Sequence, residues 1–320
     1  MPAQPRWGAP FAIGSPTRRP AFADRVASAM PAWFGTDLLW WLLFASMLQP
    51  LLTRRLLTNA RVQLRTQVEA TRGSRVILLV HRQETMSFFG VPLMRYIDVE
   101  DSEQVIRAIL ETEPDRPIDI VLHTPGGLVL AALQIARALC RHRGTVTAFV
   151  PHYAMSGGTL IALAADRIVM CEHAVLGPVD PLLDGYPAAS IRRAVARKDD
   201  KDVDDNTLIL DDQAGMALDQ VRRAVSSLLA GRLREDLIEH VASALSEGQW
   251  THDYPITSDE AAALGLPVDT AMPDEIMKMI SLYPAPKGRP PSVEYGRNSG
   301  RRGRRYPVTP ADSPPPVQRG

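Results

Sequence analysis

The sequence predicts an α/β fold built on a parallel sheet, from its short apolar runs and the spacing of the residues between them. Four runs are β-branched and continuously apolar, as in strands covered on both faces: 75–80, 118–122, 146–150 and 167–170. Between them, 102–113 and 128–142 carry apolar residues at three- and four-residue spacing, which is typical of helices. Strands that alternate with helices are joined by crossovers and run parallel, so we expect an α/β core over 68–282.

Composition excludes several classes of protein. The chain has 320 residues, is 45% hydrophobic and carries a formal net charge of zero, which gives no indication of nucleic-acid binding. Cys140 and Cys171 both lie in apolar runs and lack the spacing of a disulfide framework or a zinc site. We therefore expect them in the core, and we expect neither a metal nor a cofactor.

Both ends of the chain are predicted to be disordered. Residues 1–32 are rich in Pro and Ala with scattered Arg. Residues 284–320 hold eight Lys/Arg against two acidic residues, together with many Pro and Gly. We accordingly assign 1–32 and 283–320 as a disordered N-terminus and a disordered basic tail.

An apolar helical segment is expected between the N-terminus and the core, at 33–67. Its uncharged stretch from Leu38 to Leu52 spans 15 residues, short of the roughly 20 of a membrane-crossing helix. Trp40 and Trp41, between Asp37 and Arg54-Arg55, are nevertheless typical of an interfacial or shallowly inserted helix. We expect membrane contact through 33–55, as an anchor or a transmembrane helix, with the catalytic domain cytoplasmic. A core or oligomerisation helix is the alternative, and arginines on both sides leave the orientation open.

Two small-residue turns occupy equivalent places between a strand and a helix. "LHTPGG" follows the strand that ends at Leu122, and "AMSGGT" follows the strand that ends at Val150. In an open α/β sheet ligands gather at the carboxyl ends of the strands, and glycines let backbone N–H groups face a cavity there. Ser156 then lies at an exposed tip beside N–H donors, which suits a nucleophile with an oxyanion hole. Either turn alone is more often a simple bend, but their equivalent positions favour catalysis.

A serine nucleophile needs a base, and arginine cannot serve because it stays protonated in proteins. The chain holds only four lysines, and Lys198 and Lys201 follow Ser156 by 42 and 45 residues within "AVARKDDKDVDD". Burial and nearby positive charge would lower the pKa of such a lysine into the range of a base. The five aspartates of this segment favour a solvated loop instead, and Lys198 is better placed than Lys201 to be held inward.

Histidine is the competing base. His152 lies four residues before Ser156, and His173 follows the strand 167–170, with Asp180 or Asp166 as the orienting carboxylate. His123 and His252 are further histidines near these turns, although an isolated histidine is more often a hydrogen-bonded structural residue.

Long ordered motifs resemble the serine dehydrogenase proteinase family over about residues 70–296. They are "HTPGGLVLAALQIARAL", "VPHYAMSGGTLIALAADRIVM", "AVLGPVDPLL", "YPAASI", "DDNTLI", "WTHDYPIT" and "LGLPV". That family is related to signal peptide peptidase A and, more distantly, to the Clp protease proteolytic subunit and the crotonases. The resemblance implies a Clp/crotonase-type spiral of ββα units and peptide-bond hydrolysis by a serine.

The resemblance also implies roles for single residues. Ser156 takes the nucleophile position, and Gly127, with Gly126 as an alternative, and Gly157 take the oxyanion positions. "GPVDP" has no histidine where the Clp subunit has its own, which favours a Ser-Lys dyad with Lys198. The turn is Ser-Gly-Gly-Thr where the family commonly has Ser-Ala-Gly-Thr, and Gly157 adds backbone freedom there.

The sequence therefore predicts a membrane-associated serine endopeptidase that acts on protein or peptide substrates as a homo-oligomer. Two alternatives stay open: a membrane-associated scaffold with little or no catalysis, and acyl-CoA chemistry of the crotonase type.

Overall fold

A computed structural model describes residues 32–81, 86–88, 91–93 and 95–283. The predicted disordered ends, 1–32 and 283–320, lie almost wholly outside these residues. The chain forms two compact units, residues 1–82 with 95–284, and residues 83–94 with 285–320. The second unit contributes to the described residues only an antiparallel hairpin of β2 (Met86–Phe88) and β3 (Val91–Leu93).

A five-stranded sheet forms the centre of the first unit, in the order β1-β4-β5-β7-β12. All four neighbouring pairs are parallel. The strands are β1 (Arg75–Val80), β4 (Ile118–His123), β5 (Val146–Val150), β7 (Arg167–Met170) and β12 (Val268–Asp269). The four strands predicted from the apolar runs are confirmed, whereas the two-residue β12 is too short to give such a signal.

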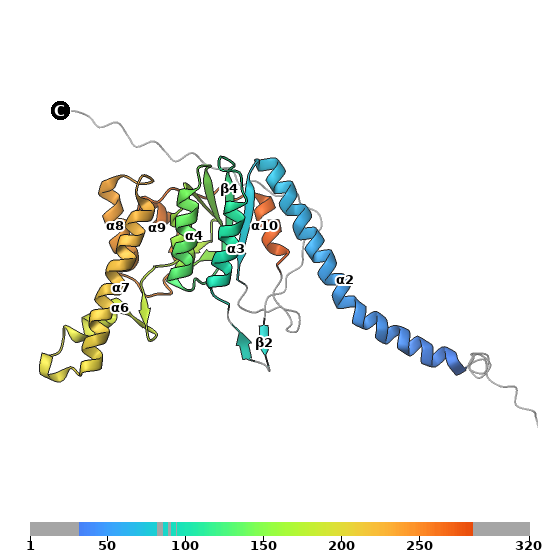
Figure 1. Ribbon diagram of the computed structural model, residues 1–320, viewed down its shortest axis with the longest axis horizontal. Helices are drawn as coiled ribbons and strands as arrows, with labels where there is room; N and C mark the ends of the chain where they lie inside the picture. The colour runs from blue at the N-terminus through green and yellow to red at the C-terminus, as the bar shows by residue number, and fades with distance from the viewer. Residues whose placement is uncertain (1–31, 82–85, 89–90, 94, 284–320) are drawn as a thin grey trace, which may run out of the picture. The chain divides into compact units, whose positions relative to one another are not determined.

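Both faces of this sheet are covered, because alternate residues of each strand enter different cores. Ile120, Ala148 and Ile168 belong to the larger core, which includes residues of α3 (Val99–Leu110), α4 (Val129–Arg141) and α5 (Gly157–Leu163). Val121 and Phe149 belong to the opposite core with residues of α2 (Ala32–Arg72) and α10 (Asp274–Ser281). Figure 1 shows α3 and α4 side by side, and α10 beside the carboxyl-terminal part of α2. Two covered faces explain why the strands are continuously apolar.

Short strands beyond the carboxyl ends of the main strands form a second sheet, in the order β11-β8-β6. These are β6 (Tyr153–Ala154), β8 (Val175–Leu176) and β11 (Ile256–Thr257). The main strands β5 and β7 thus continue into the short strands β6 and β8, and β5, β6 and α5 form one strand–strand–helix unit of the expected ββα type. The mixed α/β fold with a parallel sheet agrees with the prediction.

Two helices form an arm between the second sheet and the last part of the chain. They are α6 (Ala188–Val195) and α7 (Asp205–Leu229), joined by a 3₁₀ turn at Asp200–Asp202 and preceded by a hairpin of β9 (Leu182–Leu183) and β10 (Tyr186–Pro187). The arm has a small core of its own around Ala188, Ile191 and Ala214. The chain then continues through α8 (Glu235–Ser246) and α9 (Ser258–Ala263). Figure 1 shows α6 beside the distal part of α7.

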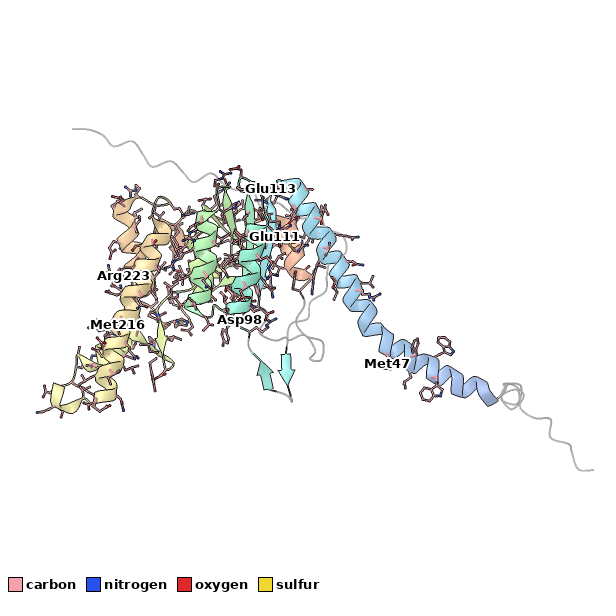
Figure 2. All side chains as sticks on the ribbon, viewed as in Figure 1. Met47, Asp98, Glu111, Glu113, Met216 and Arg223 are labelled. Carbon is pink, nitrogen blue, oxygen red and sulfur yellow. The ribbon has the colours of Figure 1, made fainter. Side chains whose placement is uncertain are left out.

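The predicted apolar segment 33–67 lies within the 41-residue helix α2. The carboxyl-terminal part of α2 is attached to the core, since the Arg61 guanidinium donates to the Leu282 carbonyl over 2.9–3.0 Å and Val68 is buried. The exposed apolar side chains of the amino-terminal part include Trp40, Trp41 and Met47, and Met47 is labelled in Figure 2. None of the helices within the described residues is long and apolar enough to cross a membrane, so the expectation of a transmembrane helix is not supported.

Candidate active site

Ser156 has a strained backbone at the turn between β6 and α5. Its φ is +48° and its ψ is −113°, a combination that non-glycine residues seldom adopt. Such strain costs about 1–3 kcal/mol and persists only where the surroundings enforce it, which is most often at functional sites. The residue is half-buried, and its hydroxyl makes no hydrogen bond to another residue in the described part of the chain. The conformation therefore presents a hydroxyl that is not engaged elsewhere.

The glycine turn after β4 lies against the serine turn, and Thr124 joins them through its backbone. The Thr124 N–H donates to the Tyr153 carbonyl over 3.2 Å, and its carbonyl accepts from the Met155 N–H over 3.0 Å. Gly126 has a φ of +102°, and a Cβ built on it would lie 3.0 Å from the Gly157 nitrogen. Glycine is required here both by the left-handed backbone and by the close approach.

Two backbone N–H groups lie close together beside Ser156. Ile97 forms a parallel bridge to Gly127, in which it donates to the Gly126 carbonyl (2.8 Å) and accepts from the Leu128 N–H (2.9 Å). In such a bridge the N–H of the central residue, Gly127, points away from Ile97. A Cβ on Gly157 would lie 3.4 Å from the Gly127 nitrogen, so the two glycines are adjacent. Neither the Gly127 nor the Gly157 N–H donates to another described residue, and this pairing is what an oxyanion hole requires.

Thr159, the last residue of the Ser-Gly-Gly-Thr turn, fixes this turn to the loop after β8. Its Oγ1 lies 2.8 Å from the carbonyl oxygens of Ala154 and Gly177 and accepts from the Gly177 N–H over 3.1 Å. The side chain is fully buried, so these bonds are shielded from water. The threonine thus has a structural role, which holds both ends of the serine turn.

Asp180, in the loop after β8, pairs with His252, which lies between α8 and β11, and the sequence did not predict this pair. The Asp180 Oδ1 lies 2.8 Å from His252 Nδ1, and the Asp180 carboxylate is completely buried. The hydrogen bond that His252 donates to this carboxylate raises the pKa of His252, against the effect of partial burial. Asp180 was expected to orient His152 or His173, and the structure pairs it with His252 instead. The sequence motif "WTHDYPIT" contains His252 and indicates a candidate functional histidine. Its partner Asp180 lies 72 residues earlier in the chain, so the motif alone does not reveal the pair.

The structure places the candidate bases in other contacts or in solvent. Lys198 follows α6, is exposed, and its amine forms no ion pair with the described side chains, while Lys201 pairs with Asp199 over 3.6 Å. The His152 ring stacks edge-on against His123, with centroids 5.4 Å apart, and His173 is exposed. Asp166, the other expected orienter, accepts from the Val146 N–H over 2.8 Å and faces Arg232. The Ser156 hydroxyl and the Gly127 and Gly157 N–H groups therefore lie together, and none of the candidate bases hydrogen-bonds this hydroxyl within the described residues.

A cavity of about 620 Å³ lies elsewhere, between α3 and α4. Its lining residues come from these helices and the loops at their carboxyl ends, and none belongs to the serine or the glycine turn. We place the functional site at the turns because the strained serine and the paired N–H groups are there.

The fold and this serine turn define a protein of the Clp-like class, and comparison with known proteins identifies the family. Residues 27–303 match the model of the ClpP-like SDH-type serine proteinases, so the chain belongs to that family. It is 49% identical over 263 residues to an uncharacterized protein of Methanocaldococcus jannaschii, which covers 82% of this chain and 92% of the relative. A second uncharacterized protein of that organism is 46% identical over 253 residues, covering 79% and 86%.

Two further comparisons are more distant. The membrane protein NfeD1b of Bacillus subtilis is 28% identical over 115 residues, covering 35% of this chain and 26% of that protein. Among solved structures, an alanine mutant of the 1510-N membrane-bound stomatin-specific protease has a TM-score of 0.39 at 20% identity, covering 57% of this chain and 79% of that chain. Another mutant of the same protease, in complex with a substrate peptide, has a TM-score of 0.39 at 21% identity, covering 57% and 75%.

Proposed function

We propose that this chain is a serine endopeptidase in which Ser156 is the nucleophile and the N–H groups of Gly127 and Gly157 form the oxyanion hole. The observation that supports the proposal most is that the strained Ser156 lies beside two backbone N–H groups, neither of which donates to another described residue. Membership of a serine proteinase family gives the reaction class.

The chemistry follows from these positions. The Ser156 oxygen attacks the carbonyl carbon of a peptide bond and its proton passes to the base, while the carbonyl oxygen becomes an oxyanion between the two N–H groups. Collapse of this tetrahedral species breaks the C–N bond, and the protonated base gives its proton to the leaving amine. Water then hydrolyses the acyl-enzyme by the same steps. The substrate lies extended beside the glycine turn, where it pairs as an added strand.

We assign the base to Lys198 and infer that its amine leaves water when copies of the chain assemble. A lysine acts as a base only when its pKa is depressed, and exposure to water opposes that shift. The same arm exposes apolar side chains on α7, namely Leu208 (42%), Ile209 (58%) and Met216 (50%). Figure 2 labels Met216 on this helix. Burial of this surface in a homo-oligomer would shield the adjoining Lys198 as well.

We also propose that the protein contacts a membrane through residues 33–55. Trp40, Trp41 and Phe44 are 56–70% exposed, which is a large exposure for aromatic side chains on one helix. The 28% likeness to a membrane protein adds support. The active site would then lie at a membrane surface, and we expect it on the cytoplasmic side.

A non-catalytic, membrane-associated scaffold is the second candidate, and the exposure of Lys198 is the observation that favours it. Hydrolysis of casein or a fluorogenic peptide by the full chain, with Ser156→Ala as the control, tests the proposal. Serine-dependent hydrolysis supports the peptidase, and its absence from the assembled wild type supports the scaffold. Thioester turnover that persists in Ser156→Ala would indicate acyl-CoA chemistry instead.

A further inference from the structure

A histidine that the proposed chemistry does not use lies directly behind the glycine turn. His81 follows β1 and is only 3% exposed. Its Nδ1 lies 2.9 Å from Thr124 Oγ1, and its Nε2 lies 3.1 Å from Asp101 Oδ2. Asp101 belongs to the first turn of α3, where it also completes a capping box with Asp98. Both ring nitrogens are therefore engaged, one towards a helix and one towards the catalytic turn.

The hydrogen bonds of this group form a chain with one consistent direction. The Gly126 N–H donates to Thr124 Oγ1 over 3.2 Å, and the same oxygen lies 2.9 Å from His81 Nδ1. When the imidazole proton is on Nε2, Nδ1 is an acceptor and the threonine hydroxyl donates to it. In that tautomer Nε2–H donates to the Asp101 carboxylate, whose Oδ2 lies 3.1 Å away. Burial of Asp101 raises the pKa of its carboxyl, but the hydrogen bond from His81, with others, outweighs this effect and the pKa is lowered. Asp101 is thus an ionised acceptor that fixes the orientation of the ring.

Thr124 is fully buried, so its hydroxyl has no solvent to replace a lost partner. It is also the residue whose backbone binds the serine turn at Tyr153 and Met155. A rotation of this side chain would leave the Gly126 N–H without its acceptor, and Gly126 directly precedes the oxyanion donor Gly127.

We propose that His81, held by Asp101, is a positioning residue for the oxyanion hole: it fixes the Thr124 hydroxyl and, through it, the Gly126–Gly127 turn. This inference rests on the proposed peptidase function for its kinetic consequence, but the arrangement of the turn can be tested without activity.

Two matched pairs of variants separate positioning from packing. A glutamine amide reaches the place of the histidine Nε2, and an asparagine amide reaches that of Nδ1. His81→Gln therefore keeps the bond to Asp101 and loses Thr124, whereas His81→Asn keeps the bond to Thr124. Likewise Thr124→Val removes the hydroxyl at constant shape, and Thr124→Ser retains it. His142→Gln is the control, because His142 hydrogen-bonds the Arg116 carbonyl outside the site (2.7 Å).

The readout is peptide hydrolysis by the full chain, split into kcat and KM. We expect His81→Gln and Thr124→Val to lower kcat by about 10- to 100-fold with KM unchanged, as for a misplaced oxyanion donor. His81→Asn and Thr124→Ser should retain most of kcat, and the control should equal the wild type. Equal losses within each pair, or no loss in any variant, would overturn the positioning role.

Amide hydrogen exchange at Gly126 makes the test independent of catalysis. All four variants are made in a Ser156→Ala background. The Gly126 amide hydrogen should exchange faster in His81→Gln and Thr124→Val than in His81→Asn and Thr124→Ser. Equal exchange in all four would overturn the inference even if the peptidase is real. If the wild type hydrolyses no peptide while the exchange rates differ as expected, the peptidase proposal fails and the positioning of the turn stands.

Discussion

Gly126 lies so close to Ser156 that a Cβ atom on Gly126 would stand 2.8 Å from the Cβ of Ser156. The same added atom would stand 2.8 Å from the Met155 carbonyl oxygen, which is backbone and cannot move aside. The serine turn and the glycine turn, although separated by a whole crossover helix, therefore fix each other. A displacement of either turn would therefore separate the Ser156 hydroxyl from the Gly127 and Gly157 N–H groups, the proposed oxyanion hole.

Substitution of Gly126 should therefore lower stability and activity more than substitution of Gly157. Gly126→Ala meets both a contact under 3 Å and a φ of +102°, and we expect it to lower stability by about 1–3 kcal/mol and to abolish acylation of Ser156. In Gly157→Ala the new methyl would lie 3.0 Å from the Ala132 Cβ, a contact that a small shift relieves. Denaturant unfolding and active-site labelling of both variants check this prediction. A labelled, stable Gly126→Ala would contradict the geometry.

The sequence was sufficient to predict four strands of the main sheet and the place of the serine turn between a strand and a helix. Continuous β-branched runs predict β1, β4, β5 and β7, because burial on both faces leaves a periodic signal over several residues. The two-residue strands of the second sheet leave no such signal, and their pairing depends on residues far apart in the chain, as between β8 and β11. The Asp184-Gly185 pair, at φ +50° and +83°, was a readable hairpin signal between β9 and β10.

Residue roles that depend on long-range contacts could not be predicted from the sequence. The pairing of Asp180 with His252 and of His81 with Thr124 joins segments 72 and 43 residues apart. Nothing in the local pattern of "GPVDP" or "LLVHRQE" indicates which partner such a side chain will find. The strained φ of Ser156 is likewise a product of the packed turns and not of serine itself.

The base is tested by two conservative lysine variants. Lys198→Arg keeps a positive charge but removes the proton acceptor, so it should abolish acylation of Ser156 while the protein stays folded. Because the amine must be deprotonated, wild-type acylation should rise from neutral into mildly alkaline pH. The measurement is the acylation rate against pH, with Lys201→Arg as the matched control. Loss in Lys201→Arg alone would move the base by three residues, and loss only in His152→Ala or His173→Ala would replace the dyad.

The Asp180–His252 pair predicts a pH-dependent contribution to stability. Its hydrogen bond raises the pKa of His252 in the folded state above the ordinary value of 6.5, so the pair stabilises the fold fully below that value. The contribution is lost as the pH rises through the folded-state pKa. The Tm of wild type should therefore exceed that of His252→Gln by more at about pH 6 than at about pH 9. If the Tm difference between wild type and His252→Gln instead grew with pH, a charged Asp180–His252 pair would be ruled out.

Membrane contact is tested by removal of residues 33–55 from the full chain. The exposed aromatic side chains of this part of α2 should bind lipid, so the full chain should sediment with vesicles and the shortened chain should stay in the supernatant. Replacing Trp40 and Trp41 by serine should give an intermediate result. If the full chain stays in the supernatant and its oligomer dissociates on deletion, the segment joins subunits instead.

The most direct measurement is covalent labelling of the full chain with a fluorophosphonate, followed by mass spectrometry of the labelled peptide. The account predicts one modified residue, Ser156, and no labelling of Ser156→Ala, while His142→Gln is labelled as fast as the wild type. Absence of labelling in the wild type, or equal labelling of Ser156→Ala, would contradict the assignment of Ser156 as the nucleophile.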